Sequence, residues 1–198
     1  MIDDTFTTKS EWFRLHQEDF CQALGIDASR KYEQEGGPSL KQCAVIIRQH
    51  SSFPLLDLQQ LLRWFLFNLL VGNADGHGKN ISLLYHRDGT TSLAPFYDLV
   101  CTRNYKNLAR EMAMRIGGAW DPDLVGLKQL ETFGTELAVR PKLVVEQTRE
   151  FAELLTTALP SVVGRFRVEY GPSPVLERLP IVIRKLVRRV TSQLKTNH

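Results

Sequence analysis

Three oxygen-bearing side chains in this sequence have the types and the spacing that a magnesium–nucleotide site requires. Asp75 lies within the polar stretch VGNADGHGKN at 71–80, Asn80 ends that stretch, and Asp98 follows eighteen residues later. Phosphoryl transfer needs a carboxylate that receives the proton of the attacking hydroxyl, and hard oxygen ligands that hold Mg²⁺ against the phosphates. Asp75 fits the role of the base, and Asn80 and Asp98 fit the roles of the metal ligands.

The residues alone leave two other interpretations open. Asn73, Asp75 and Asn80 are residue types that bond their own backbone, so the stretch also fits an ordinary surface turn. A metal-dependent hydrolase built on Asp75, His77 and Asp98 is the second alternative, because imidazole and carboxylate groups bind catalytic metals. The Asp-x4-Asn spacing favours phosphoryl transfer, since it is the spacing of the kinase catalytic loop.

The segments on either side of the polar stretch predict how it is held. Residues 57–70 are apolar on almost every side, which predicts a helix in the centre of the domain, with Asp57 as its N-cap. The runs 81–86 and 91–95 are strand-like and flank Asp88-Gly89, a strong hairpin signal. The polar loop is therefore predicted to lie between a buried helix and a small hairpin.

The remainder of the chain is predicted to be mostly helical. Apolar residues recur at three- and four-residue spacing in five further segments: 12–24, 40–50, 124–138, 141–159 and 180–195. We expect the fourth of these helices to end before Pro160, and the charged, glycine-rich stretch 30–39 to be a loop. No internal repeat or long linker divides the sequence. It therefore predicts a mainly α fold with one small β-hairpin, forming a single domain over residues 1–198.

The composition is that of a globular protein, with 43% hydrophobic and 24% charged residues. No apolar run reaches the roughly 18 residues that span a bilayer. The polar amino terminus does not resemble a secretory signal. Three widely spaced cysteines are expected to be reduced thiols, because their number is odd and no zinc pattern surrounds them. We therefore expect a cytoplasmic protein with no contact to a membrane.

The net charge of +3 is unevenly distributed. Residues 160–198 hold eight Lys and Arg against two Glu, a balance of +6, which leaves −3 for residues 1–159. Four of these cations are close together: Arg184, Lys185, Arg188 and Arg189. Such a cluster permits nucleic-acid binding as an alternative function. The solvated face of a helix is the favoured interpretation, because no helix-turn-helix or zinc pattern accompanies the cluster.

Four boxes in the sequence carry a resemblance to a known family. They are RLHQEDFCQALG at 14–25, KYEQEGGPS at 31–39, FNLLVGNADGHGKN at 67–80 and LAPFYDLV at 93–100. Together, and in this order, they resemble the carboxy-terminal lobe of the HipA family of serine/threonine kinases, which are toxins of bacterial toxin–antitoxin pairs. The resemblance implies a protein-kinase-like C-lobe, a helical bundle with a small β-hairpin next to the catalytic loop.

The resemblance also implies roles for individual residues. Asp75 matches the catalytic base of the family, and Asn80 and Asp98 match its magnesium ligands. Six residues match segments that contact the nucleotide: His77, Gly78, Lys79, Asn80, Tyr97 and Asp98. The implied cofactors are ATP and Mg²⁺, and the implied partners are a protein substrate with a Ser or Thr hydroxyl and an antitoxin, through which DNA would be met only indirectly.

The amino-terminal lobe of the family has no counterpart in these residues, because the resemblance begins near the hinge. The sequence contains no Gly-x-Gly-x-x-Gly and no Walker loop, so no group that clamps the α- and β-phosphates is identified. We therefore expect that residues 1–198 alone bind ATP weakly and transfer phosphate poorly unless a separate N-lobe completes them. The alternative is a catalytically silent, truncated lobe that acts as an antitoxin- or DNA-binding module.

Overall fold

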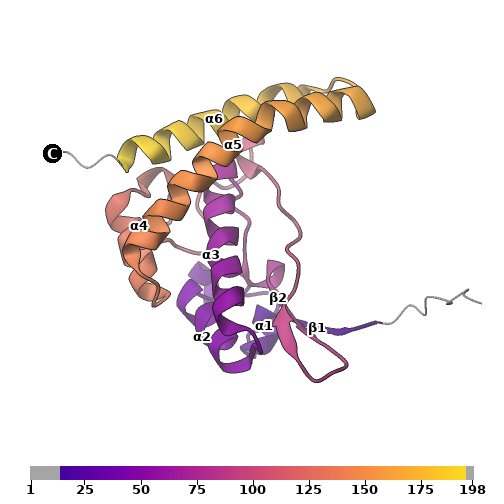
Figure 1. The fold of residues 1–198 in the computed structure, drawn as a ribbon, viewed down its shortest axis with the longest axis vertical. Coiled ribbons are helices and arrows are strands. Elements are labelled where there is room, and N and C mark those ends of the chain that lie inside the picture. Colours follow the sequence, from indigo (N-terminus) through magenta and orange to yellow (C-terminus); the bar gives the residue numbers. More distant parts are fainter. Residues whose placement is uncertain (1–13, 195–198) are drawn as a thin grey trace, which may run out of the picture.

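A computed structural model of the chain describes residues 14–194, and it is mainly helical with one small sheet (Figure 1). The elements, in chain order, are β1 His16–Asp19, α1 Phe20–Ala23, η1 Glu33–Glu35, α2 Leu40–His50, α3 Pro54–Val71, η2 Gly78–Asn80, β2 Ser82–Tyr85, β3 Thr91–Leu93, η3 Thr102–Asn104, η4 Pro122–Leu124, α4 Leu127–Glu136, α5 Pro141–Tyr170 and α6 Pro174–Gln193. The predicted mainly α fold with a hairpin is confirmed. The single-domain boundary 1–198 stays a prediction.

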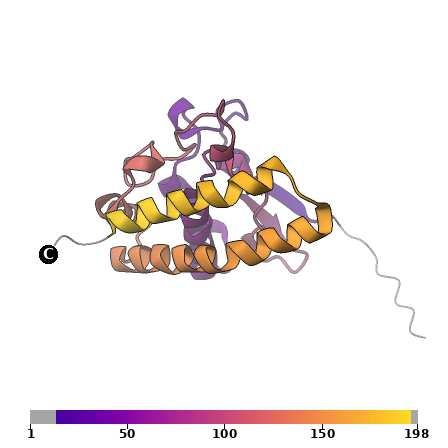
Figure 2. The same ribbon diagram turned by 90° about the horizontal axis from the view of Figure 1, so that it is seen from above.

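Helix α3 forms the centre of the core, as its all-round apolar surface predicts. Leu61, Leu66 and Leu70 are fully buried on it, and Trp64 and Phe65 are nearly so. Helices α5 and α6 lie side by side across the carboxy-terminal end of α3 (Figures 1 and 2). A helix that is apolar on every face is stable only when neighbours cover it on every face. Of the helices between residues 14 and 194, none has the length and apolarity to cross a membrane.

The sheet has three antiparallel strands in the order β1-β2-β3, one more than predicted. The hairpin of β2 and β3 is confirmed, with Leu84 opposite Ser92. The prediction of a helix over 12–24 is wrong for His16–Asp19, which pairs with β2 as strand β1. The open edge of the hairpin offers those polar residues a ladder of hydrogen bonds that outweighs their weak helical pattern. Residues 12 and 13 lie outside the described part of the chain.

The predicted N-cap of the central helix is also wrong. Helix α3 begins three residues earlier, at Pro54, which suits the first helical position because proline has no N–H to leave unpaired. Asp57 is instead only 1% exposed and accepts hydrogen bonds from Ser51 Oγ at 2.6 Å and from the Leu93 backbone N–H at 2.8 Å. The carboxylate therefore ties the start of α3 to strand β3.

The last two helices are longer than predicted. Helix α5 continues through Pro160 to Tyr170, and α6 begins at Pro174 rather than at 180, with the Ser173 hydroxyl accepting from the Leu176 N–H at 3.2 Å. Proline removes one helical hydrogen bond, but Pro160 is exposed, so water can satisfy the carbonyl that it releases. Packing between α5 and α6 offsets the remaining cost.

Replacing Asp57 with Ala tests the link between α3 and β3. We expect the free energy of unfolding to fall by about 3 kcal/mol, because the substitution removes two hydrogen bonds to a charged group and leaves the buried Leu93 N–H without an acceptor. Urea denaturation followed by circular dichroism measures the change. Asp27→Ala is the control, since its carboxylate bonds only the exposed Ser29. Equal destabilisation by the two substitutions would contradict the assigned role.

Candidate functional site

The polar loop begins where the central helix makes a turn that only glycine allows. Gly72 caps α3 with φ +75°, in the left-handed region. A Cβ at this position would lie 2.6 Å from Leu186 Cδ1 of α6 and 2.8 Å from Arg103 Cγ. The close approach of α6 and of the segment after the hairpin therefore fixes the direction in which the loop leaves the helix.

Asn73 joins the two halves of the candidate site. Its Oδ1 accepts a hydrogen bond from the Asp75 backbone N–H at 3.1 Å, and its Nδ2 donates to the Asp98 carbonyl at 3.2 Å and to Asn68 Oδ1 at 3.1 Å. Asn68 and Asn73 are both buried. One buried amide thus brings Asp75 and Asp98 into the same region. The sequence indicated only a turn-forming role for Asn73, because its partners lie outside its own loop.

The structure brings the two predicted metal ligands into contact. Asn80 Nδ2 donates to Asp98 Oδ2 at 3.0 Å, and Asn80 Oδ1 accepts from the His77 N–H at 3.0 Å. Asp98 is exposed and has φ +57°, a left-handed conformation that aspartate tolerates better than most residues and that clusters at functional sites. Asn80 turns its Nδ2 toward Asp98, and its Oδ1, already bonded to the His77 N–H, keeps a second lone pair. The open Asp98 carboxylate and this amide oxygen would fit a Mg²⁺ ion that keeps most of its waters.

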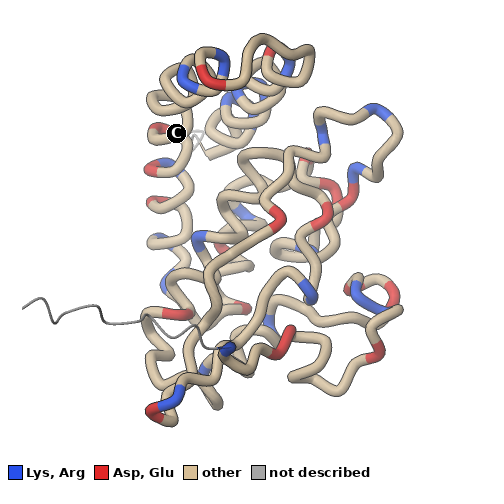
Figure 3. Tube along the Cα trace, turned by 90° about the vertical axis from the view of Figure 1, so that its right-hand side faces the viewer, with Lys and Arg blue, Asp and Glu red and all other residues tan. Residues whose placement is uncertain are grey.

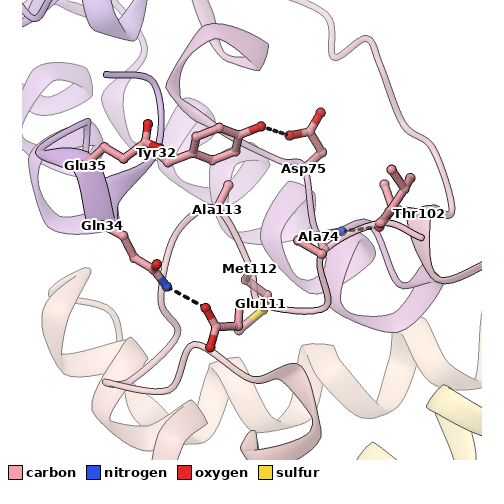
Figure 4. Close-up of a pocket in the computed structure, with 11 residues that line it drawn as sticks. Tyr32, Gln34, Glu35, Ala74, Asp75, Thr102, Glu111, Met112 and Ala113 are labelled. Carbon is pink, nitrogen blue, oxygen red and sulfur yellow. Dashed lines mark hydrogen bonds between the residues drawn. The ribbon is translucent and has the colours of Figure 1, made fainter. Parts of the chain in front are cut away.

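Asp75, the predicted base, is accessible and is held by a residue that sequence analysis missed. Its side chain is 46% exposed, and Tyr32 donates a hydrogen bond to its Oδ1 at 2.6 Å (Figure 4). Burial, and then the bond to the Asp75 carboxylate, raise the pKa of Tyr32 to about 12, so the phenol keeps its proton at neutral pH. Tyr32 belongs to the KYEQEGGPS box, but nothing in the spacing of that box marks it as a partner of Asp75.

His77 is buried beside the base rather than open to a ligand. Its Nε2 lies 4.0 Å from Asp75 Oδ1, and its ring packs edge-on against Tyr32 with 5.5 Å between centroids. Burial lowers the pKa of His77, followed by the nearby Lys31 ammonium, while Asp75 and Asp98 act in the opposite direction. A neutral imidazole at physiological pH follows. The predicted contact of His77 with a nucleotide stays a prediction.

The other predicted nucleotide contacts lie around the same loop. Gly78 is packed so closely on Pro38 that a Cβ would come within 2.5 Å of Pro38 Cγ. The Tyr97 hydroxyl donates to the Lys79 carbonyl and lies 3.1 Å from Ser82 Oγ, which pins the loop to the hairpin exit. The side chain of Lys79 has no ion-pair partner among residues 14–194. The close packing on Pro38 explains why residue 78 is a glycine, and the contact with the loop explains the Tyr97 hydroxyl. The Lys79 ammonium and the Tyr97 ring remain accessible.

A cavity of about 390 Å³ opens beside Asp75, and we call it the base pocket. Tyr32 and Asp75 meet on one wall, and Gln34 and Glu111, which are joined by a 3.0 Å hydrogen bond, form another (Figure 4). Its floor is fixed by a backbone hydrogen bond of 2.8 Å from Ala113 N–H to the Ala74 carbonyl. The pocket is wide enough for a peptide side chain. It lies next to the Asp75 carboxylate, the predicted acceptor of a proton from that side chain.

Two alternatives from the sequence find less support. The described residues contain no group of three or more His, Cys, Asp or Glu side chains that could hold a metal, which disfavours the hydrolase built on Asp75, His77 and Asp98. Lys and Arg are interspersed with Asp and Glu along the trace and form no single basic layer (Figure 3). Within the α6 cluster of Arg184, Lys185, Arg188 and Arg189, the last is already paired with Asp123 at 2.5 Å.

Comparisons with known proteins identify the family of the chain. The chain matches the HipA-like C-terminal domain over residues 3–159. Y4mE of Sinorhizobium fredii is 47% identical over 131 residues, covering 66% of this chain and 31% of that protein. The serine/threonine-protein kinase toxin HipA of Shewanella oneidensis is 34% identical over 162 residues, covering 76% of this chain and 37% of that protein.

A solved structure shares the fold. A chain in the Shewanella oneidensis MR-1 toxin–antitoxin complex of HipA, HipB and operator DNA matches with a TM-score of 0.83 and 27% identity, covering 93% of this chain and 46% of that one. The present chain thus spans about a third to a half of the length of these relatives. The predicted kinase-like helical lobe is confirmed, and the chain belongs to the HipA-like C-terminal domain family.

Proposed function

We propose that this chain is the catalytic lobe of a serine/threonine protein kinase that transfers phosphate from Mg²⁺–ATP to a Ser or Thr hydroxyl. The observation that carries the proposal is the 3.0 Å contact between Asn80 and Asp98, linked through Asn73 to an exposed Asp75. These contacts tie the candidate base and one candidate ligand, both in the loop 71–80, to the second candidate ligand at the hairpin exit. Kinship with the HipA kinase toxin supports the same reaction.

Each residue has a distinct part in the proposed reaction. Asp75 takes the proton of the substrate hydroxyl, and Tyr32 holds one oxygen of its carboxylate in place. Asn80 and Asp98 would hold Mg²⁺, which neutralises charge on the transferring phosphate when it is bound. Such catalysis depends mainly on positioning and electrostatics. The buried Asn73 and His77 would hold Asp75 and the metal ligands in fixed positions.

The proposal assigns the remaining phosphate contacts to a lobe outside residues 1–198, in the same or a separate chain. The sequence contains no glycine-rich phosphate loop. The relatives described above are about two to three times as long as the region that matches this chain. Without those groups, residues 1–198 bind ATP weakly and transfer phosphate slowly. An antitoxin is the proposed regulatory partner, because the matched structure contains HipA with HipB and operator DNA.

The second candidate function is a catalytically silent lobe that binds an antitoxin. The two functions differ in their need for Asp98, because an antitoxin-binding surface does not require a magnesium ligand. Loss of phosphate transfer, with retained antitoxin binding, on changing Asp98 would favour the kinase.

Replacing Asp98 with Asn tests the magnesium site while keeping a residue that tolerates a left-handed backbone. We expect the affinity for Mg²⁺–ATP to fall about tenfold or more, because a charged metal ligand is lost. Without Mg²⁺, ATP should bind both proteins equally. Isothermal titration calorimetry, with Asp88→Asn in the exposed hairpin turn as the matched control, measures this. Equal affinities for Mg²⁺–ATP in wild type and Asp98→Asn would remove Asp98 from the site.

Replacing Asp75 with Asn tests the bond from Tyr32. The pKa of Tyr32, about 12 in the wild type, should fall toward the ordinary value near 10 but stay above it, because burial remains. Since the folded-state pKa is the higher one, the neutral phenol contributes stability below about pH 10, and that contribution is lost as the pH rises toward 12. NMR titration of ¹³C-labelled tyrosine measures the pKa of Tyr32 in the wild type and in the Asp75→Asn variant.

Tyr85 is the internal control of that titration, because its pKa is raised by a different carboxylate, Glu18, at 2.7 Å. Its titration should not change in the Asp75→Asn variant. A Tyr32 midpoint that does not move, or that moves together with Tyr85, would show that Tyr32 does not hold Asp75 in solution.

A further inference from the structure

A second cavity, of about 570 Å³, adjoins the base pocket, and we call it the basic pocket. It lies between the segment 103–110, the turn at Asp123 and one face of helix α6. Five cationic side chains line it: Arg103, Lys106, Arg110, Lys185 and Arg189. None of these residues has a part in the reaction proposed above.

The positive charge of the basic pocket is mostly uncompensated. Asp123 is its one acidic lining residue, and this carboxylate pairs with Arg103 at 2.6 Å and with Arg189 at 2.5 Å. Lys106, Arg110 and Lys185 have no ion-pair partner within residues 14–194. Arg103 also lies 4.0 Å from Asp121 beside the pocket, so five cations against two carboxylates leave a net charge of about +3 in a concave space, where low-dielectric walls strengthen the field.

The wall of the basic pocket is rigid on the side of the catalytic loop. Arg103 is only 12% exposed on its side chain, its backbone N–H donates to the Gly72 carbonyl at 3.1 Å, and its Nε is buried without a hydrogen-bond acceptor among the described residues. Arg178 of α6 donates to the Asn104 carbonyl and to Asn104 Oδ1. Arg103 and the helix α6 therefore form a fixed wall, and Lys106 and Arg110 extend from the exposed segment opposite it.

The two cavities share a boundary and differ in charge. Leu108 and Ala109 line both of them, so they meet at this short stretch. The base pocket is lined by the carboxylates of Glu35, Asp75 and Glu111 and by no Lys or Arg. An anionic group is therefore repelled from the base pocket and attracted to the basic pocket. A peptide that crosses residues 108–109 contacts both the acidic base pocket and the basic pocket.

We propose that the basic pocket is a substrate-docking subsite for an anionic side chain, a carboxylate or a phosphorylated hydroxyl, of the protein whose Ser or Thr occupies the base pocket. This inference rests on the proposed kinase function, and it names the substrate class as acidic next to the acceptor hydroxyl. Nucleic acid fits less well, because the cations converge on a concave space that adjoins the base pocket, while Arg184 and Arg188 of the same helix do not line it.

The test measures peptide binding to the full chain without nucleotide, by fluorescence anisotropy. The probes are fluorescein-labelled peptides with a central serine, flanked by glutamates, by glutamines, or by a phosphoserine, and a short DNA duplex. The pocket variant is Lys106→Glu/Lys185→Glu, and the matched control is Arg184→Glu/Arg188→Glu. Both double variants change the net charge equally at exposed positions. Circular dichroism establishes that both are folded.

We expect the wild type and the control to bind the glutamate or phosphoserine peptide about tenfold more tightly than the glutamine peptide, and the pocket variant to lose that preference. Whichever anion binds more tightly identifies the source of the charge. No preference in the wild type, equal losses in the two double variants, or tighter binding of DNA would each overturn the proposal. Calorimetry with Mg²⁺–ATP is independent of this assay, so a failed kinase assignment is recognised separately.

Discussion

The site depends on the hydrogen bonds of one buried asparagine. Asn73 holds the Asp75 backbone with its oxygen and the Asp98 carbonyl with its nitrogen, so two carboxylates from different segments share one anchor. Asn68, in the last turn of α3, supplies the third partner through its Oδ1, while its Nδ2 has no hydrogen-bond partner among the described residues. Buried amides are costly unless they are paired, so this network specifies one arrangement of the loop against the hairpin exit.

The sequence predicted the parts of the fold that depend on local pattern. The central helix and the hairpin at Asp88-Gly89 follow from periodicity and turn chemistry, while the roles of Asn80 and Asp98 as metal ligands stay predictions. Strand β1 could not be predicted in this way, because it exists only through pairing with the hairpin edge. The extension of α5 past Pro160 was missed for a similar reason, since contacts with α6 decide it.

The positioning residues of the site were also beyond local pattern. Tyr32 reaches Asp75 across 43 positions of sequence, and a tyrosine in a charged loop has no periodicity that marks its partner. Thr102 is also a long-range partner of the loop, since its hydroxyl accepts from the Ala74 N–H and donates to the Gly72 carbonyl. Resemblance to the family identified the boxes, while the contacts between boxes came from the structure. The roles of the chemical residues therefore stay predictions, and the structure adds the residues that position them.

The contact at Gly72 bears on how much of the chain makes up one folding unit. The family match ends at residue 159, yet the methyl of Leu186 that presses on this glycine belongs to a helix that starts at Pro174. A fragment cut where the match ends would leave the first turn of the loop facing water. Helices α5 and α6 thus belong to the same folding unit as the loop, and local unfolding of α6 would also loosen the candidate site.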